Sequence, residues 1–167
     1  MNIENMLRNF YYKRKNGATK EEILKLEKNY HCILPDFYKE ILSFSNGLEL
    51  DNEETFIFLF NTSYILEANK KIYETTIFAP NLLVIGNTGG DEILVVEQKK
   101  DSEKIYIYDP GALFPGEEDI TIIHIEKWFL NGCPMGEELY NFIFANLFSL
   151  PRASTIYKKL GFKYLYF

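Results

Sequence analysis

The sequence predicts an α+β fold with a mainly antiparallel sheet of about five or six strands, flanked by helices. Apolar residues recur at helical spacing through the first 45 positions. Three runs rich in β-branched and aromatic residues then follow one another between residues 82 and 108, joined by loops short enough for antiparallel neighbours. Helical spacing returns from residue 137. Helices that are separated in this way from a meander of strands are typical of α+β folds.

The first half of the chain contains three predicted helices. Apolar residues at positions 3, 6, 7, 10 and 11 predict a helix over residues 2–15. Thr19 and Glu22 form a capping box that begins a second helix, which continues to about residue 30. The third helix covers residues 36–45, with Pro35 at its start and Asn46-Gly47 as a left-handed C-cap.

The remaining elements are expected from similar signals. Strands are predicted at residues 55–60, 82–86, 92–98, 104–108 and 120–125. Helices are predicted at residues 65–73, 137–148 and 154–160, and the last six residues form an edge strand or a packed end. The acidic stretch after Gly47 is expected to be a loop.

Composition places the chain among folded proteins and predicts one domain over residues 1–167. The hydrophobic fraction is 47% and the aromatic fraction 16%, which a disordered chain would lack. No apolar run reaches the roughly 20 residues that a membrane-spanning helix needs, and the N-terminus lacks a signal-peptide pattern. We therefore expect a cytoplasmic protein. Its two cysteines, Cys32 and Cys133, have no CxxC partner and are expected to be reduced.

The segment "NLLVIGNTGGDEILVV" resembles a phosphate-binding loop at first sight. It leads into a β-branched run instead of a helix, and it has neither the Lys-Ser/Thr pair nor the GxGxxG spacing of such loops. The alternative is a wide hairpin in which Gly86, Gly89 or Gly90 supplies a positive φ and Asp91 accepts hydrogen bonds from backbone amides. We expect the hairpin, and no cofactor.

The sequence gives little support for a metal site or a catalytic site. His31 beside Cys32, and His124 with Cys133, lack the repeated short spacing of zinc ligands, so no metal site is predicted. Cys133 and His124 could in principle meet as a nucleophile and a base, but no protease signature flanks the cysteine. Neighbouring carboxylates in the chain are more often solvated faces than general acid/base pairs.

Two aromatic stripes could in principle stack nucleic-acid bases: Phe56, Phe58 and Phe60, and Tyr106 and Tyr108. They lack interleaved Lys and Arg, which favours half-buried sheet faces. The charge distribution also argues against binding of nucleic acid. Residues 1–40 carry 8 basic and 6 acidic side chains, residues 41–149 carry 6 and 18, and residues 150–167 carry 4 and none. The middle segment, at −12, repels phosphate backbones and attracts basic surfaces.

Two blocks of the sequence resemble the SUKH superfamily, whose best-known eukaryotic member is a yeast cell-wall assembly regulator. The first block is "ILPDFYKEILSFSNGLEL", and the second is "FAPNLLVIGNTGGDEILVVE" followed by "KIYIYDPG". The positions that match the pattern are structural: Leu34, Pro35, Asn46, Gly47, Gly90 and Asp91. The resemblance implies an α+β fold without catalytic residues. For bacterial members it also implies an immunity protein that neutralises a cognate toxin, often a nuclease, of a polymorphic or contact-dependent system.

Together, the resemblance and the charge map predict a protein-binding module that acts on a basic toxin domain, with no nucleic-acid or membrane partner. The alternative is a regulatory or scaffold adaptor with a housekeeping partner. The residues expected to bind the partner are Glu49, Asp51, Glu53 and Glu54, and secondarily Glu117, Glu118 and Asp119. The competing explanation for these acids is that they only keep the protein soluble.

Overall fold

The computed structural model describes residues 2–113, 120–122, 124–135, 138–139 and 141–142. The chain divides into two compact units, residues 1–132 and residues 133–167. In the second unit, the Leu139 N–H donates to the Met135 carbonyl (3.3 Å), and residues 138–139 and 141–142 are helical. The rest of this section concerns the first unit. One domain over the whole chain stays a prediction.

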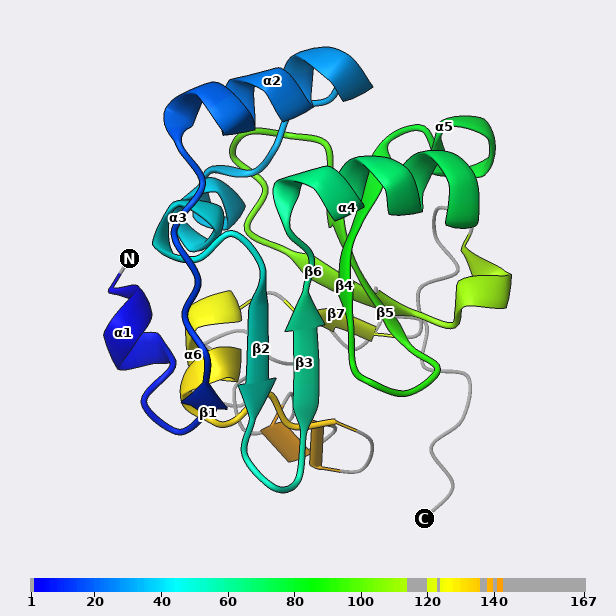
Figure 1. Ribbon diagram of the computed structural model, residues 1–167. Coiled ribbons are helices and arrows are strands. Elements are labelled where there is room, and N and C mark those ends of the chain that lie inside the picture. Colours follow the sequence, from blue (N-terminus) through cyan, green and yellow to red (C-terminus); the bar gives the residue numbers. More distant parts are fainter. Residues whose placement is uncertain (1, 114–119, 123, 136–137, 140, 143–167) are drawn as a thin grey trace. The chain divides into compact units, whose positions relative to one another are not determined.

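The first unit is built on an antiparallel sheet, which confirms the α+β class (Figure 1). It has seven described strands where about five or six were expected, and they are hydrogen-bonded in chain order. The strands are β1 (Tyr11–Tyr12), β2 (Leu48–Asp51), β3 (Phe56–Leu59), β4 (Leu82–Asn87), β5 (Ile93–Glu97), β6 (Ile105–Tyr108) and β7 (Ile120–Ile122). Each neighbouring pair is antiparallel. The sheet is therefore a simple meander.

Helices cover parts of this sheet. They are α1 (Ile3–Met6), α2 (Lys20–Tyr30), α3 (Asp36–Phe44), α4 (Thr62–Glu67), α5 (Thr75–Phe78) and α6 (Ile125–Leu130), with a π-helix η1 (Ala68–Ile72) and a 3₁₀ turn η2 (Pro110–Ala112). In α2 the predicted capping box is present: the Glu22 N–H donates to Thr19 Oγ1 (3.2 Å), and the Thr19 N–H donates to Glu22 Oε2 (2.7 Å). The predicted positions of α2 and α3 are confirmed.

The prediction of one helix over residues 2–15 is wrong. Helix α1 ends at Met6, and residues 11 and 12 form β1, which pairs with the end of β2. Apolar residues at the predicted spacing, such as Met6 and Phe10, are buried. Tertiary burial therefore accounts for the spacing beyond the first turn, and pairing with a distant strand overrides the local helical preference.

Two buried polar side chains form hydrogen bonds with the backbone where the β3–β4 pairing ends. The two strands pair only at Phe58–Asn87 and Leu59–Gly86. The Tyr38 hydroxyl lies 3.1 Å from the Phe60 carbonyl oxygen and 3.2 Å from that of Ile85. The Ile85 carbonyl also accepts from the Phe60 N–H (2.8 Å), so the hydroxyl adds to the backbone hydrogen bonding at this end of the β3–β4 pairing.

The second side chain is Asn69, which η1 carries to the edge of β4. Its Oδ1 accepts from the Val84 N–H (2.8 Å), and its Nδ2 donates to the carbonyls of Val84 (2.7 Å) and Ile65 (2.9 Å). Thr75 Oγ1 donates to Asn69 Oδ1 (3.1 Å) and receives the hydroxyl hydrogen of Tyr30. A fully satisfied buried network of this kind fixes one arrangement of α2, η1 and β4.

Candidate functional site

One face of the β2–β3 hairpin is exposed, while the other is part of the core. Burial alternates along β2, with Leu48 and Leu50 buried and Glu49 and Asp51 exposed. This is the period-2 pattern of a half-buried strand. The acids expected in a loop after Gly47 therefore begin inside a strand, which corrects that prediction. The alternation Leu-Glu-Leu-Asp was the signal that could have revealed it.

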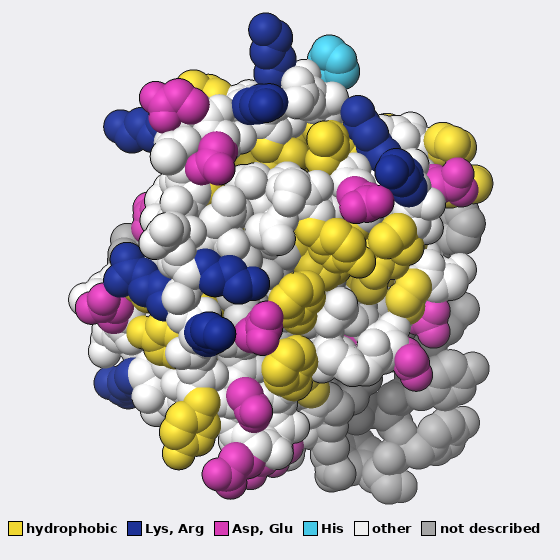
Figure 2. All heavy atoms as spheres, in the orientation of Figure 1, with side chains coloured by type: hydrophobic (Ala, Val, Ile, Leu, Met, Phe, Trp, Pro, Cys, Tyr) yellow, Lys and Arg dark blue, Asp and Glu magenta, His cyan; other side chains and the backbone are white. Residues whose placement is uncertain are grey.

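The strand register places aromatic rings beside these carboxylates. Asp51 is paired with Tyr11 of β1 on one side and with Phe56 of β3 on the other, and Glu49 is paired with Phe58. Cross-strand partners project their side chains from the same face of a sheet. We call these five residues the aromatic–acidic face. Figure 2 shows acidic side chains next to hydrophobic ones over β2 and β3.

The aromatic rings of this face are open to solvent to different degrees. Tyr11 is 75% exposed and Phe56 is 41% exposed, whereas Phe58 is half-buried. Aromatic side chains such as Tyr and Phe are enriched at the centres of protein interfaces. The sequence expectation of half-buried sheet faces fits Phe58. The rings of Phe60 and Tyr108 are fully buried.

The turn between β2 and β3 holds the remaining acids of the first predicted set. Asn52 Oδ1 accepts from the N–H groups of Glu54 (3.3 Å) and Thr55 (2.7 Å), and Asp51 Oδ1 accepts from the Glu53 N–H (2.9 Å). Glu53 has a φ of 73°, in the left-handed region. Both glutamate side chains are exposed. The turn thus places two further carboxylates beside the aromatic–acidic face.

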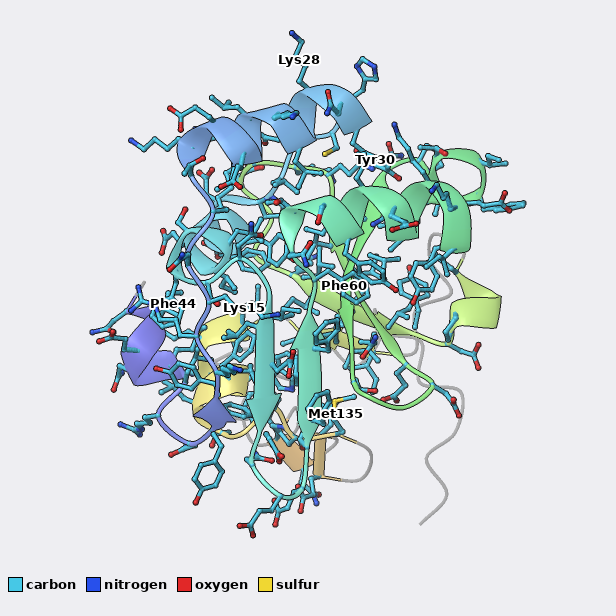
Figure 3. The ribbon with its side chains drawn as sticks, viewed as in Figure 1. Lys15, Lys28, Tyr30, Phe44, Phe60 and Met135 are labelled. Carbon is cyan, nitrogen blue, oxygen red and sulfur yellow. The ribbon has the colours of Figure 1, made fainter. Side chains whose placement is uncertain are left out.

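Glu49 has an ionic partner within the chain. Lys15 Nζ lies 3.8 Å from Glu49 Oε1, and both side chains are about half exposed. Figure 3 labels Lys15 beside β2. Exposed pairs of this kind add little to stability, but the lysine offsets the charge of this carboxylate. The four acids are therefore brought together, although they are not equivalent.

The Leu-Pro positions of the resemblance support the start of α3. Leu34 is fully buried, and its N–H donates to Glu27 Oε1 (2.9 Å). Pro35 is the N-cap residue of α3, and its carbonyl accepts from the N–H groups of Tyr38 and Lys39 (3.1 Å each). Both residues hold the backbone at the entry to this helix.

The Asn-Gly positions join α3 to α4, and they are not the predicted left-handed C-cap. Helix α3 ends in an extended Ser45. Asn46 Oδ1 accepts from the Thr62 N–H (2.8 Å), and its Nδ2 donates to Thr62 Oγ1 (3.2 Å). Gly47 has a φ of 89°, and a Cβ there would lie 3.1 Å from Asn61 Cβ. The pair therefore links the chain entering β2 to the first turn of α4.

The Gly-Gly-Asp turn joins β4 to β5, as predicted, and Gly89 is one of the three glycines expected to supply the positive φ, but the hydrogen bonds expected of Asp91 are not found in the described part of the chain. Gly89 has the positive φ (74°), while Gly90 does not. Asn87 Oδ1 accepts from the Gly89 N–H (3.0 Å), and the structure records no hydrogen bond of the Asp91 side chain within the described residues. A Cβ at Gly89 would lie 2.6 Å from Phe56 Cδ1. The Phe56 ring of the aromatic–acidic face therefore lies against this turn.

The cysteines are unsuited to nucleophilic chemistry. Burial raises the pKa of Cys32 to about 11, helped by the nearby Glu27 carboxylate. Burial also raises the pKa of Cys133 well above its ordinary value. Because the thiolate is the nucleophile, both groups are unreactive near neutral pH. His31 is exposed in a left-handed conformation after α2, and His124 precedes α6.

The remaining candidates are the second set of acids, one hollow and the potential metal ligands. The second predicted set of acids, Glu117, Glu118 and Asp119, lies outside the described residues. Between α3 and α6 there is a hollow of about 660 Å³ with acids such as Asp101 and Glu103 in its wall. The structure contains no group of three or more potential metal ligands within its described part. Among the helices described, none is long and apolar enough to cross a membrane.

Comparison with known proteins gave one finding. The model of the SMI1 / KNR4 family (SUKH-1) matches residues 17–146. This range includes both blocks on which the resemblance was based, together with β2, β3 and the Gly-Gly-Asp turn. No curated protein matches the chain.

Proposed function

The chain belongs to the SMI1 / KNR4 family (SUKH-1), and from this we propose that it is an immunity protein that binds a cognate toxin and neutralises it. The family includes immunity proteins and other protein-binding modules. In the proposed mode of action, the protein covers the surface with which the toxin engages its substrate. No covalent chemistry is needed, because occlusion by a tight complex is sufficient.

The aromatic–acidic face is the observation that carries this proposal. Interfaces gain most of their affinity from a few large aromatic or charged side chains, and their centres are enriched in Tyr and Phe. Tyr11 and Phe56 provide such groups, and Asp51 lies between them. The exposed Glu53 and Glu54 extend the negative charge at the edge. A surface of this composition favours a partner that is basic and partly apolar.

A nuclease toxin meets that description. Its cleft must be basic to hold the phosphate backbone, so an acidic surface can occupy the cleft or its rim. The charge of −12 over residues 41–149 also disfavours direct binding of nucleic acid by this chain. The basic cleft of a nuclease and the negative charge of this chain both support a protein partner that itself binds an anion.

Co-expression tests the proposal. The chain is produced together with the toxin domain encoded in the neighbouring open reading frame, and growth and complex formation are measured. The variant Asp51→Lys with Glu54→Lys should lose rescue and weaken binding at least tenfold. The control Asp101→Lys with Glu103→Lys makes the same change in charge at exposed acids of the α3–α6 hollow and should keep both.

Two results would contradict the proposal. The first is full rescue by the variant reversed at Asp51 and Glu54, with both variants folded according to circular dichroism. The second is the absence of any rescue by the wild-type chain. A chain that binds a housekeeping protein and not the toxin would instead be a regulatory adaptor.

A further inference from the structure

Within the aromatic–acidic face, we propose that Tyr11, Asp51 and Phe56 form an anchor site for an arginine side chain of the protein partner. We call these three residues the anchor row. In the anchor site, the guanidinium group pairs with the Asp51 carboxylate and lies against the neighbouring rings. This inference rests on the proposed function only in assuming a protein partner with a basic surface. It adds which basic side chain is selected and which residues select it.

The anchor row crosses three adjacent strands. Asp51 of β2 is in register with Tyr11 of β1 and with Phe56 of β3. Directly opposed residues in antiparallel strands have Cβ atoms about 4.5–5.5 Å apart, so the two aromatic side chains begin on either side of the Asp51 side chain. All three side chains are exposed, with Tyr11 at 75% and Phe56 at 41%. A planar cation from outside can therefore reach the acid and a ring at the same time.

Asp51 is better suited to a partner than Glu49. Its Oδ1 accepts from the Glu53 N–H (2.9 Å), which fixes the orientation of the carboxylate, and the described residues supply no hydrogen bond to Oδ2. Glu49, by contrast, has Lys15 Nζ at 3.8 Å. The oriented carboxylate loses little side-chain freedom on binding. The charge that remains open on this face is therefore that of Asp51.

Phe56 is also held in place before a partner arrives. Gly89 approaches its ring so closely that an added Cβ would lie 2.6 Å from Cδ1. One part of the ring therefore rests on the Gly-Gly-Asp turn, while 41% of the residue stays exposed. A ring with a fixed position is a better stacking surface than a mobile one, because it pays less ordering entropy.

The chemistry of the anchor row selects arginine over lysine. A guanidinium group is planar and weakly hydrated, so it can lie flat on a ring and still donate in its plane to a carboxylate. The chain contains a similar dual contact, in which a backbone carbonyl takes the place of the carboxylate. The guanidinium carbon of Arg14 lies 4.2 Å from the centre of the Phe44 ring, and its Nε donates to the Phe44 carbonyl (3.0 Å). Figure 3 labels Phe44.

Peptide titration followed by NMR tests the inference on the full-length chain. Three peptides of equal length are used, in which glycine alternates with arginine, lysine or the neutral isostere citrulline. At about 150 mM salt, where long-range attraction is screened, the arginine peptide should shift the amide signals of the anchor row. It should bind about threefold or more tightly than the lysine peptide, and the citrulline peptide should not bind.

Variants separate a specific anchor from general charge attraction. Asp51→Asn keeps an oxygen that accepts from the Glu53 N–H, and Phe56→Leu keeps an apolar side chain, so both should fold. Each should raise the dissociation constant of the arginine peptide about two- to fivefold. The control Asp101→Asn removes an exposed acid of the α3–α6 hollow and should leave the constant unchanged.

The inference is overturned by equal binding of the arginine and lysine peptides, by signal shifts confined to other surfaces, or by unchanged affinity in both anchor variants. Toxin rescue is measured separately. If rescue occurs but the peptides do not discriminate, the immunity proposal stands and the anchor is wrong. If rescue fails but the peptides behave as expected, the anchor stands for a different protein partner.

Discussion

At the scale of single residues, Gly89 decides where the Phe56 ring can lie. Its φ of 74° suits glycine, and an added methyl group would lie 2.6 Å from the ring. We expect Gly89→Ala to lower the free energy of unfolding by about 1–2 kcal/mol, through backbone strain and displacement of the ring. Denaturant unfolding measures this. Gly90→Ala is the matched control, because its φ is not positive and its nearest contact would be Thr88 Oγ1 at 3.8 Å. Equal losses in the two variants would contradict this account.

Asn69 gives a second prediction at this scale, in which the effect depends on pH. In Asn69→Asp, a protonated carboxyl group can still donate to the Val84 carbonyl and accept from the Val84 N–H, whereas a carboxylate can only accept. Asn69 is fully buried, so the pKa of the new group should be raised in the folded state. Because the pKa of this group is higher in the folded state, its contribution to the stability of the variant is fully present below the unfolded pKa of about 3.9. The contribution is lost as pH rises through the folded pKa.

The measurement is urea unfolding of the wild type and Asn69→Asp between about pH 4 and pH 7.5. At the acidic end the variant should be about 1 kcal/mol less stable than the wild type, because one carboxyl hydrogen replaces the two that Asn69 Nδ2 donates to Val84 and Ile65, and at neutral pH it should be about 3 kcal/mol less stable. A difference in unfolding free energy that stays constant over this range would show that the hydrogen bonds to Val84 do not control the stability of this region.

At the scale of elements, α2 depends on its capping box. Thr19 and Glu22 satisfy each other's backbone N–H groups at the first turn. Thr19→Ala should destabilise the protein by about 1 kcal/mol in thermal or chemical unfolding. Lys25→Ala, at an exposed position of the same helix, should change the unfolding free energy by less than about 0.5 kcal/mol. If the lysine variant costs as much, the cap is not what stabilises this helix.

The same elements show what could be predicted from the sequence. Helix α2 and strands β4 to β6 have strong local signals, namely a capping box and β-branched runs, and their predictions are confirmed. Strand β1 has only two residues, and pairing with β2 defines it, whereas β2 has a local signal in its alternation Leu-Glu-Leu-Asp that the prediction missed. Helix α6 was missed because its sequence follows directly on a predicted strand. Short elements are defined by distant partners, which local patterns do not contain.

The candidate site is likewise defined by contacts between segments that are distant in the sequence. The acids were predicted by composition, but their alternation with aromatic rings depends on the register of three strands. Tyr11 was assigned to a helix and Asp51 to a loop, so no local pattern could place them together. The role of Gly89 also needs the structure, since the contact with Phe56 crosses from one hairpin to the next.

At the scale of the whole molecule, net charge and local contacts should affect different steps of binding. The chain has a net charge of −6, and residues 41–149 carry −12. A field of this kind acts over about a Debye length, which is roughly 8 Å at physiological salt, and mainly accelerates encounter with a basic partner. The contacts of the anchor row act only once the two surfaces have met, so they should mainly slow dissociation.

This separation gives a kinetic prediction for the complex with the toxin domain. Raising ionic strength from about 20 mM to about 500 mM should lower the association rate constant about tenfold or more and change the dissociation rate less. Glu53→Gln with Glu54→Gln should reduce this salt dependence, because both acids are exposed at the rim. Asp51→Asn should leave most of it and speed dissociation instead. Surface plasmon resonance measures both rates. If the variants at Glu53 and Glu54 sped dissociation and Asp51→Asn reduced the salt dependence, the rim, and not Asp51, would lie at the centre of the interface.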